Sequence, residues 1–278
     1  MASRETTPFL LTGSASTLAG APGIFPSLNL INSLQVPIEI TELHFMVTST
    51  DGGEDDILSV EGGEISLQAG RHIITNGFAP LMTLTPLREN NNNESVFDQI
   101  TASTFRWVLP RPLILKSGEG ISGAYRLSTT VFQGQSTATI VARGRRMPSN
   151  TRIARRCVAF ASGAFFTAAN VPAASGVFQN PFQVPLKIRS INAQTINDAQ
   201  PLGAATTATI TGPGGLVPDA LRSLAVNVMG SGIFAGRYAL EIQHDLNPRD
   251  AYQIVLNQTP GEFSPVAIGI MGYREEEE

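Results

Sequence analysis

The sequence predicts an all-β protein with two tandem β-sandwich domains in one chain. Short runs rich in β-branched residues alternate apolar and polar side chains, and Gly, Pro, Asn or Asp separate these runs roughly every 8–12 residues. Segments of the first half also recur in the second half. At 278 residues, the chain has room for two domains of ordinary size.

Strand patterns dominate along the chain. In Ile38–Phe45 nearly every second side chain is apolar, and Thr137–Ala142 and Tyr252–Leu256 are short β-branched runs. Helical patterns are scarce, and we expect short helical connectors at Glu94–Thr101, after a polar loop, and at Pro218–Val228, which opens with a Pro-Asp start signal. These patterns favour a sandwich or barrel.

A weak internal repeat relates the two halves. Asn32–Leu43 aligns with Asn180–Ile191 at an offset of 148 residues, with five of twelve positions identical. Further matches follow in the same order: Ala124-Tyr125 with Ala251-Tyr252, Gly134 with Gly261, Ile140 with Ile268, Gly144 with Gly272, and Arg146 with Arg274. We therefore expect two domains of like topology, at 1–147 and 148–278, the second with an acidic tail.

The matched residues are expected to serve the architecture rather than chemistry. Pro37 and Pro185 are expected where a strand enters its sheet, since Pro cannot donate to a strand ladder. Gly134 and Gly261 are expected to provide a positive φ in the turn before the last strand of each half.

The chain carries few charges, and most of its cations are Arg. Charged residues make up 15% of the sequence, against about 25% in an average soluble protein. The basic residues are 17 Arg and 2 Lys. Arg suits interfacial ion pairs, so we expect much of the surface to be covered in a large assembly, with the codon bias of a GC-rich genome as the alternative. The single Cys157 excludes a disulfide scaffold, and neither a signal peptide nor a membrane-spanning helix is expected.

The sequence contains no catalytic or cofactor motif, so we expect no enzyme activity, no metal site and no cofactor. His44, His72 and His244 are too far apart in sequence for a metal-binding pair, and His44 is interpreted as a surface or satisfied core residue. No GxSxG, Walker A or dinucleotide-binding pattern is present. Cys157 follows two arginines that can lower a thiol pKa, but a buried small hydrophobic residue is the favoured interpretation.

Acidic residues gather in two places. Asp51–Asp56, continued by Glu61 and Glu64, is interpreted as a solvated loop, with a calcium site as the alternative because Ca²⁺ takes several oxygen ligands. The closing Glu275–Glu278 is expected to be a flexible, solubilising tail.

Six arginines gather at the expected domain junction and are the candidate interface residues: Arg143, Arg145, Arg146, Arg152, Arg155 and Arg156. The favoured interpretation is that they pair with acidic partners across a domain or subunit interface. Contact with the phosphates of nucleic acid or lipid head groups is the alternative. No aromatic residues interleave with these arginines, and sequence-specific nucleic-acid binding is not expected.

The chain resembles the double jelly-roll major capsid proteins of tailless icosahedral phages with an internal membrane. The resemblance rests on the paired segments Asn32–Leu43 with Asn180–Ile191 and Ala124–Gly144 with Ala251–Gly272, on the low charge, and on the absence of catalytic motifs. It implies two four-stranded sheets in each domain. It further implies a homotrimer of hexagonal outline that tiles an icosahedral shell, with the protein made in the host cytoplasm and located in the virion.

The resemblance also suggests partners and contact loops. Besides further copies of the chain, penton or minor capsid proteins and the lipids of an internal membrane are candidate partners. Loops 48–64 and 86–98 are candidates for the outer surface or the trimer contacts. The first eight residues hold no amphipathic helix that would anchor on a membrane, which departs from the family picture.

Two other functions remain open at this stage. One is another β-sandwich virion component, such as a spike, tail or decoration protein. The other is a jelly-roll enzyme acting on polysaccharide, which needs paired carboxylates in a cleft. The aromatic residues are 14 Phe against 4 Tyr and 1 Trp, a balance that suits packing better than the stacking of sugars.

Overall fold

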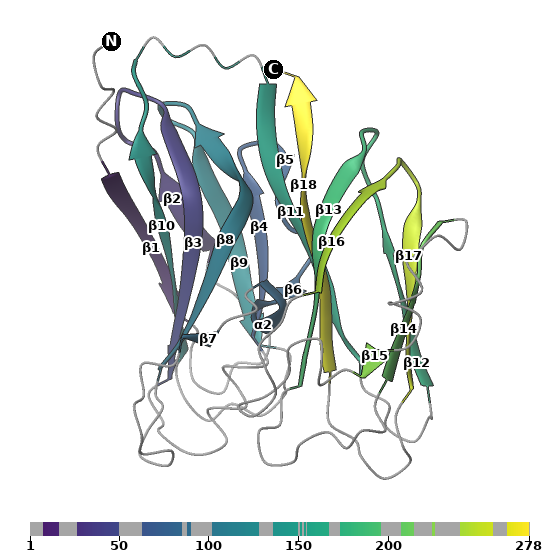
Figure 1. Ribbon diagram of the computed structural model, residues 1–278. Coiled ribbons are helices and arrows are strands. Elements are labelled where there is room, and N and C mark those ends of the chain that lie inside the picture. The colour runs from purple at the N-terminus through teal and green to yellow at the C-terminus, as the bar shows by residue number, and fades with distance from the viewer. Residues whose placement is uncertain are drawn as a thin grey trace.

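A computed structural model gives the fold as two β-sandwiches side by side (Figure 1). It describes residues 8–16, 27–49, 63–84, 88–89, 102–127, 136–149, 151, 153, 155–166, 173–195, 207–213, 224–225, 240–257 and 266–277. In these ranges the chain is almost entirely β-strand, as the sequence predicts. No helix among these residues is long and apolar enough to cross a membrane.

The first sandwich contains two sheets built from antiparallel pairs of strands. Its β3 sheet has the order β1 (Pro8–Ser16), β10 (Ser136–Arg146), β3 (Ile38–Ser49), β8 (Ala102–Leu115) and β7 (Arg88–Glu89). Its β9 sheet has the order β2 (Ser27–Ile31), β9 (Gly120–Leu127), β4 (Gly63–Ala69) and β5 (His72–Ile73), and β6 (Ala79–Pro80) also pairs with β4. A single helical turn, α2 (Leu81–Leu84), follows β6.

The second sandwich repeats this plan. Its β13 sheet has the order β11 (Arg155–Phe166), β18 (Val266–Glu277), β13 (Leu186–Thr195) and β16 (Leu240–Leu246). Its β17 sheet has the order β12 (Ala173–Gln179), β17 (Ala251–Asn257), β14 (Thr207–Thr211) and β15 (Leu224–Ala225).

Both sandwiches have jelly-roll topology. In the first sandwich β1 pairs with β10 and β10 with β3, while β2 pairs with β9 and β9 with β4. In the second sandwich β11 pairs with β18 and β18 with β13, while β12 pairs with β17 and β17 with β14. Two packed sheets with these crossing connections are the jelly-roll arrangement. The sheets of the second sandwich have four strands each, as expected, and those of the first have five each, through the short strands β7 and β6. The predicted fold class, two tandem jelly rolls in one chain, is therefore confirmed. The exact division at 147/148 stays a prediction.

Alternating side chains fill the core of each sandwich. In β3 the apolar residues Ile38, Ile40, Leu43 and Phe45 are buried, and the alternation skips one position where the register shifts between Ile40 and Glu42. Such a bulge turns the following side chains back to the same face of the sheet. The first core also holds the chain's only Trp, Trp107.

The internal repeat corresponds to repeated contacts. The Asn32 side chain is buried and donates to the carbonyls of Val36 (3.0 Å), Leu115 (3.3 Å) and Lys116 (3.0 Å). The buried Asn180 donates in the same way to Val184 (3.0 Å) and Leu246 (2.9 Å). Asn32 thus joins the loop before β3 to the end of β8, and Asn180 joins the loop before β13 to the end of β16. The matched Pro37 and Pro185 close these two loops, each one residue before its strand.

A pair of matched glycines lies opposite backbone irregularities. Gly144 in β10 faces a register shift in β3, and Gly272 in β18 faces the corresponding shift in β13. A Cβ atom at either glycine would overlap a main-chain oxygen, of Glu39 or of Lys187. Both halves therefore need glycine at this position. Gly134 and Gly261, the other matched glycines, lie outside the described residues.

Two predictions from the sequence are wrong. Glu275–Glu277 do not form a flexible tail but end strand β18, because β11 pairs with them through Cys157, Arg156 and Arg155. The expected helix Pro218–Val228 contains β15, whose residues Leu224 and Ala225 pair with β14, so a sheet edge overrides the local helix signal. The expected helix Glu94–Thr101 lies outside the described residues, and the sequence reasoning did not anticipate α2.

Candidate functional site: the junction between the sandwiches

Small residues let the second sandwich pack closely against the first. Ala159, Ala161 and Met271, from β11 and β18, belong to the hydrophobic core of the first sandwich. The turn α2 presses on the same face, and a Cβ added to Gly269 would lie 2.6 Å from Oγ1 of Thr83. One face of the β13 sheet is thus covered by the neighbouring sandwich of the same chain.

Main-chain hydrogen bonds join the two sandwiches. The amide of Ala161 donates to the carbonyl of Ile74 (2.8 Å), and the amide of Asn76 donates to the carbonyl of Ala161 (2.9 Å). The buried side chain of Asn192 in β13 donates to the carbonyl of Thr83 (2.7 Å). These bonds fix the position of β11 and β13 on the first sandwich, because a shift of one residue would leave buried polar groups unpaired.

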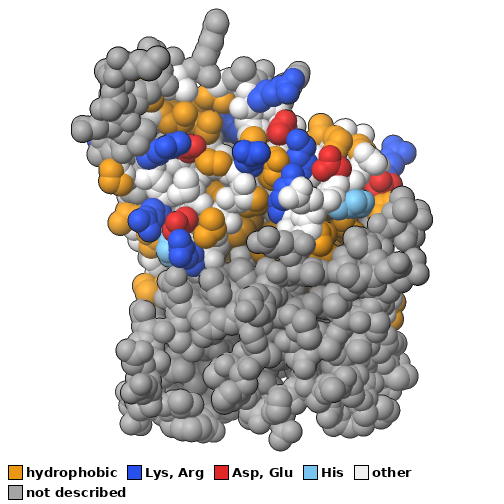
Figure 2. All heavy atoms as spheres, in the orientation of Figure 1, with side chains coloured by type: hydrophobic (Ala, Val, Ile, Leu, Met, Phe, Trp, Pro, Cys, Tyr) orange, Lys and Arg blue, Asp and Glu red, His pale blue; other side chains and the backbone are white. Residues whose placement is uncertain are grey.

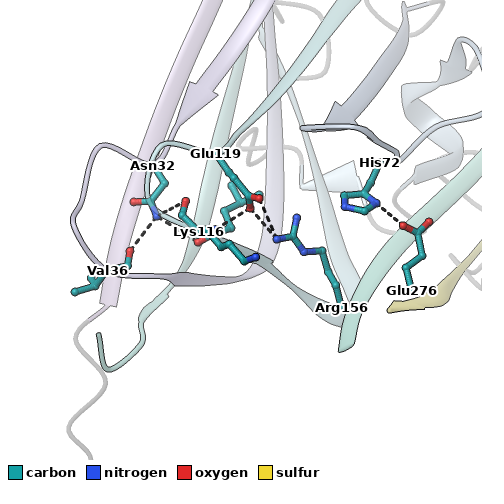
Figure 3. A network of polar contacts seen from close by, with 8 residues as sticks. Asn32, Val36, His72, Lys116, Glu119, Arg156 and Glu276 are labelled. Carbon is teal, nitrogen blue, oxygen red and sulfur yellow. Dashed lines mark hydrogen bonds and ion pairs between the residues drawn. The ribbon is translucent and has the colours of Figure 1, made fainter. Parts of the chain in front are cut away.

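A buried arginine crosses the junction (Figure 3). Arg156 in β11 is 2% exposed, and its Nη2 donates to both carboxylate oxygens of Glu119, at 3.1 and 2.9 Å. Glu119 lies in the turn between β8 and β9, and it also accepts a hydrogen bond from the backbone amide of Lys116 (2.8 Å). Arg156 is the buried member of the pair, whereas Glu119 is half-buried, so loss of Glu119 would leave a guanidinium in the interior without this carboxylate.

A second ionic group lies beside this pair. His72 of β5 contacts Glu276 of β18 (Figure 3), and Glu276 also accepts from Nε of Arg274. Arg274 is buried, donates to the carbonyl of Ile73 (2.7 Å) and lies 3.8 Å from the ring centroid of Phe182. Burial acts to raise the pKa of Glu276, but the hydrogen bond and charge of Arg274, together with His72, outweigh it and lower that pKa.

A tyrosine gathers three cations at the rim of the junction. Arg111 of β8 and Arg189 and Lys187 of β13 lie 5.6, 5.2 and 5.7 Å from the ring centroid of Tyr273. Burial acts to raise the pKa of Tyr273, but hydrogen bonds from Arg111 and Arg189 outweigh it and lower that pKa. Lys187 also pairs with Glu275 at 3.1 Å. Charges from both sandwiches therefore meet on one aromatic side chain.

The structure separates the six predicted interface arginines. Arg156 enters the junction, whereas Arg143 and Arg145 lie on the solvent side of the β3 sheet, paired with Glu42 (3.7 Å) and Glu39. Arg146 and Arg155 are exposed, and Arg152 lies outside the described residues. The sequence reasoning did not single out the partners Glu119, Glu276 and Arg274 as a set, because they come together only through strand pairing.

The other sequence candidates are also placed. Cys157 is half-buried, and burial, followed by the charge of Glu275, raises its thiol pKa, which disfavours the reactive thiolate. His44 is half-buried and contacts Glu42 at 3.0 Å, as expected of a satisfied residue. Glu64 is buried and pairs with Arg126, while Asp51–Asp56 and Glu61 lie outside the described residues. Loops 48–64 and 86–98 likewise lie mostly outside them.

One sheet face of the first sandwich is left open. On the solvent side of the β3 sheet, Leu10 and Val108 are 65% and 57% exposed. Between them lies Glu42, which accepts hydrogen bonds from Arg106. Figure 2 shows hydrophobic, basic and acidic side chains interspersed on the face of the molecule turned to the viewer. Among the described residues, no group of three or more His, Cys, Asp or Glu side chains is arranged to hold a metal ion.

Comparison with known proteins places this architecture. No protein-family model matches the sequence, and no curated protein matches it significantly. A chain in the atomic structure of Sulfolobus turreted icosahedral virus matches 97% of this chain over 90% of its own length, with a TM-score of 0.55 and 13% identity. The crystal structure of the major capsid protein of that virus matches 95% of this chain over 96% of its own, with a TM-score of 0.51 and 12% identity.

A more distant match is the major capsid protein P2 of bacteriophage PM2, with a TM-score of 0.41, 8% identity, and coverage of 96% of this chain and 98% of that one. The two closer likenesses show the fold: this chain is a double jelly roll. The resemblance expected from the sequence is confirmed at that level.

Proposed function

We propose that the protein is a viral major capsid protein, which assembles through trimers into an icosahedral shell. Its role is structural rather than catalytic, and its function resides in the interfaces between copies. The observation that carries this proposal is the double jelly roll along the whole chain, matched end to end with the capsid protein of Sulfolobus turreted icosahedral virus.

The repeat itself indicates which surface a second copy covers. Gly144 and Gly272 are equivalent, so the neighbouring pair Leu10–Arg143 in the first sandwich corresponds to Ala161–Met271 in the second. Ala161 and Met271 are buried under the first sandwich of the same chain, whereas Leu10 and Arg143 face solvent. The second sandwich of another copy fits this open face in the same manner, and a head-to-tail contact of this kind closes into a ring when its rotation allows.

This surface includes two of the candidate interface arginines, Arg143 and Arg145. Each pairs with a carboxylate of β3 in the single chain, so a neighbouring copy meets partly neutralised cations beside apolar Leu10. Interfaces combine such Arg with apolar side chains because guanidinium groups are weakly hydrated. We propose that the contact also involves Arg146, the last residue of β10, and Arg155, the first residue of β11. Arg152, between them in the sequence, belongs to the same proposal.

The finer assignments belong to the same proposal. The protein is made in the cytoplasm of an infected host cell and is located in the virion. Penton or minor capsid proteins and the lipids of an internal membrane are its further proposed partners.

The solution mass tests the proposal. We expect light scattering to give about three times the chain mass of 29.6 kDa, and negative-stain images to show hexagonal outlines or closed shells. The variant Leu10→Glu with Arg143→Glu is expected to remain monomeric with an unchanged circular dichroism spectrum. The matched control is Val177→Glu, at a residue 63% exposed in β12, and it is expected to assemble normally. A wild-type chain that stays monomeric at high concentration overturns the proposal.

A further inference from the structure

A polar cleft of about 400 Å³ opens at the junction, in the region shown in Figure 3. Its walls come from three segments: the turn Gly70–Arg71 with the adjoining His72 of β5, the β8–β9 turn with Lys116 and Glu119, and Arg156 of β11. Both sandwiches therefore contribute to it. Its volume lies within the roughly 300–1,000 Å³ of small-molecule sites.

The lining carries more positive than negative charge. Arg71, Lys116 and Arg156 are cations, and Glu119 is the one carboxylate among the lining residues. Arg156 donates to both carboxylate oxygens of Glu119, so these two charges largely compensate each other and the excess positive charge of the lining comes from Arg71 and Lys116. Arg71 and Lys116 are exposed at the mouth, where an incoming anion meets them first.

The walls hold these groups in place before any ligand arrives. Asn32 donates to the carbonyl of Lys116 (3.0 Å) and accepts from the amide of Gly118 through its own carbonyl (2.9 Å). The amide of Gly70 donates to the carbonyl of Gly120 (3.0 Å), which ties the opposite turn to β9. The backbone of the turns that carry Arg71 and Lys116 is therefore in place before a ligand binds, and only their side chains need to become ordered.

We propose that this cleft binds a phosphate group between the two sandwiches. Guanidinium and ammonium groups that converge from separate segments match the several oxygens of a phosphate, and Arg does so through paired N–H donors. His72 is the one aromatic residue among the six lining residues, but it is buried and contacts Glu276, so the lining offers no exposed ring on which a nucleobase would stack. The ligand is therefore a phosphate monoester without a base, either a soluble one or the head group of an anionic lipid.

This inference does not depend on the proposed function. A ligand that touches Arg71 and Lys116 on one sandwich and Arg156 on the other stabilises their contact whether or not the chain assembles into a shell.

Calorimetric titration of the full chain with inorganic phosphate and with glycerol phosphate tests the soluble source, with potassium chloride at equal ionic strength as the blank. We expect Arg71→Gln and Lys116→Gln each to weaken binding about tenfold. The matched control is Arg249→Gln, an exposed arginine in the corresponding turn of the second sandwich, and we expect it to bind as the wild type does.

Flotation with vesicles of phosphatidylcholine, with and without phosphatidic acid, tests the lipid source. Binding that requires phosphatidic acid and is lost in Arg71→Gln assigns the site to a lipid head group, and binding of glycerol phosphate without vesicle binding assigns it to a soluble ligand. Absence of both, or equal weakening by Arg249→Gln, overturns the proposal. The mass measurement described above is unaffected by either result, so the two proposals fail separately.

Discussion

The two buried asparagines allow a quantitative test of the internal repeat. The two Nδ2 hydrogens of Asn32 are shared among three carbonyl oxygens, and its Oδ1 accepts a hydrogen bond from the amide of Leu34. Asn180 makes three hydrogen bonds, two from Nδ2 and one accepted from the amide of Phe182. At about 1 kcal/mol net for each bonded hydrogen, Asn32→Ala and Asn180→Ala are each expected to lower the free energy of unfolding by about 2–3 kcal/mol.

Asp at the same positions separates hydrogen bonding from packing. Asp has the shape of Asn and keeps the acceptor for the amide two residues ahead, but it places a second oxygen where Nδ2 faced carbonyl groups. A buried carboxylate beside carbonyl oxygens lacks a donor. Asn32→Asp and Asn180→Asp are therefore expected to destabilise by at least about 1 kcal/mol more than the Ala variants, since a lost bond becomes a repulsion.

Urea denaturation followed by two probes measures these changes. The fluorescence of Trp107, buried in the first core, reports on the first sandwich, and far-ultraviolet circular dichroism reports on both. Asn29→Ala, at an exposed residue of β2, is the control and is expected to change stability by less than about 0.5 kcal/mol. Losses below about 1 kcal/mol in both Ala variants, or Asp variants as stable as the wild type, would refute the reasoning.

Three further predictions concern the junction and the core. Because the pKa of Glu276 in the folded chain lies below its ordinary value of 4.5, its stabilisation is complete above pH 4.5 and is lost as the pH falls through the folded pKa. Acid titration of Glu276→Gln is therefore expected to show a shallower loss of stability below pH 4.5 than the wild type, and parallel curves would contradict this. Gly269→Ala places a Cβ 2.7 Å from that of Thr83. We therefore expect thermal unfolding to show a stability loss of about 1–3 kcal/mol, which Thr83→Gly partly restores. An unchanged melting temperature would count against the close approach. The hydroxyl of Tyr125 is buried with no partner among the described residues, whereas that of Tyr252 contacts His244. Tyr125→Phe is therefore expected to be neutral or stabilising, while Tyr252→Phe is expected to lower the free energy of unfolding by about 1 kcal/mol. Equal losses of unfolding free energy in urea denaturation of the two variants would reject this distinction.

Local patterns in the sequence determined the fold class. The alternation in Ile38–Phe45 reports that one face of the strand is buried, and this holds whichever strands lie beside it. The matched Asn32 and Asn180 could also be found in the sequence, because a side chain that bonds within its own loop leaves a local signature. The candidate cleft had no such signature.

Only the tertiary structure decided strand order and the partners of the charges. Arg156 and Glu119 are 37 residues apart, and Arg274 and Ile73 are 201 apart, so no local pattern connects them. The same cause explains why Glu275–Glu277 read as a solvated tail: their charges look exposed until β11 pairs with them and Lys187 and Arg274 lie alongside. Periodicity records whether a side chain is buried, whereas the choice of neighbour depends on the packing of the whole chain.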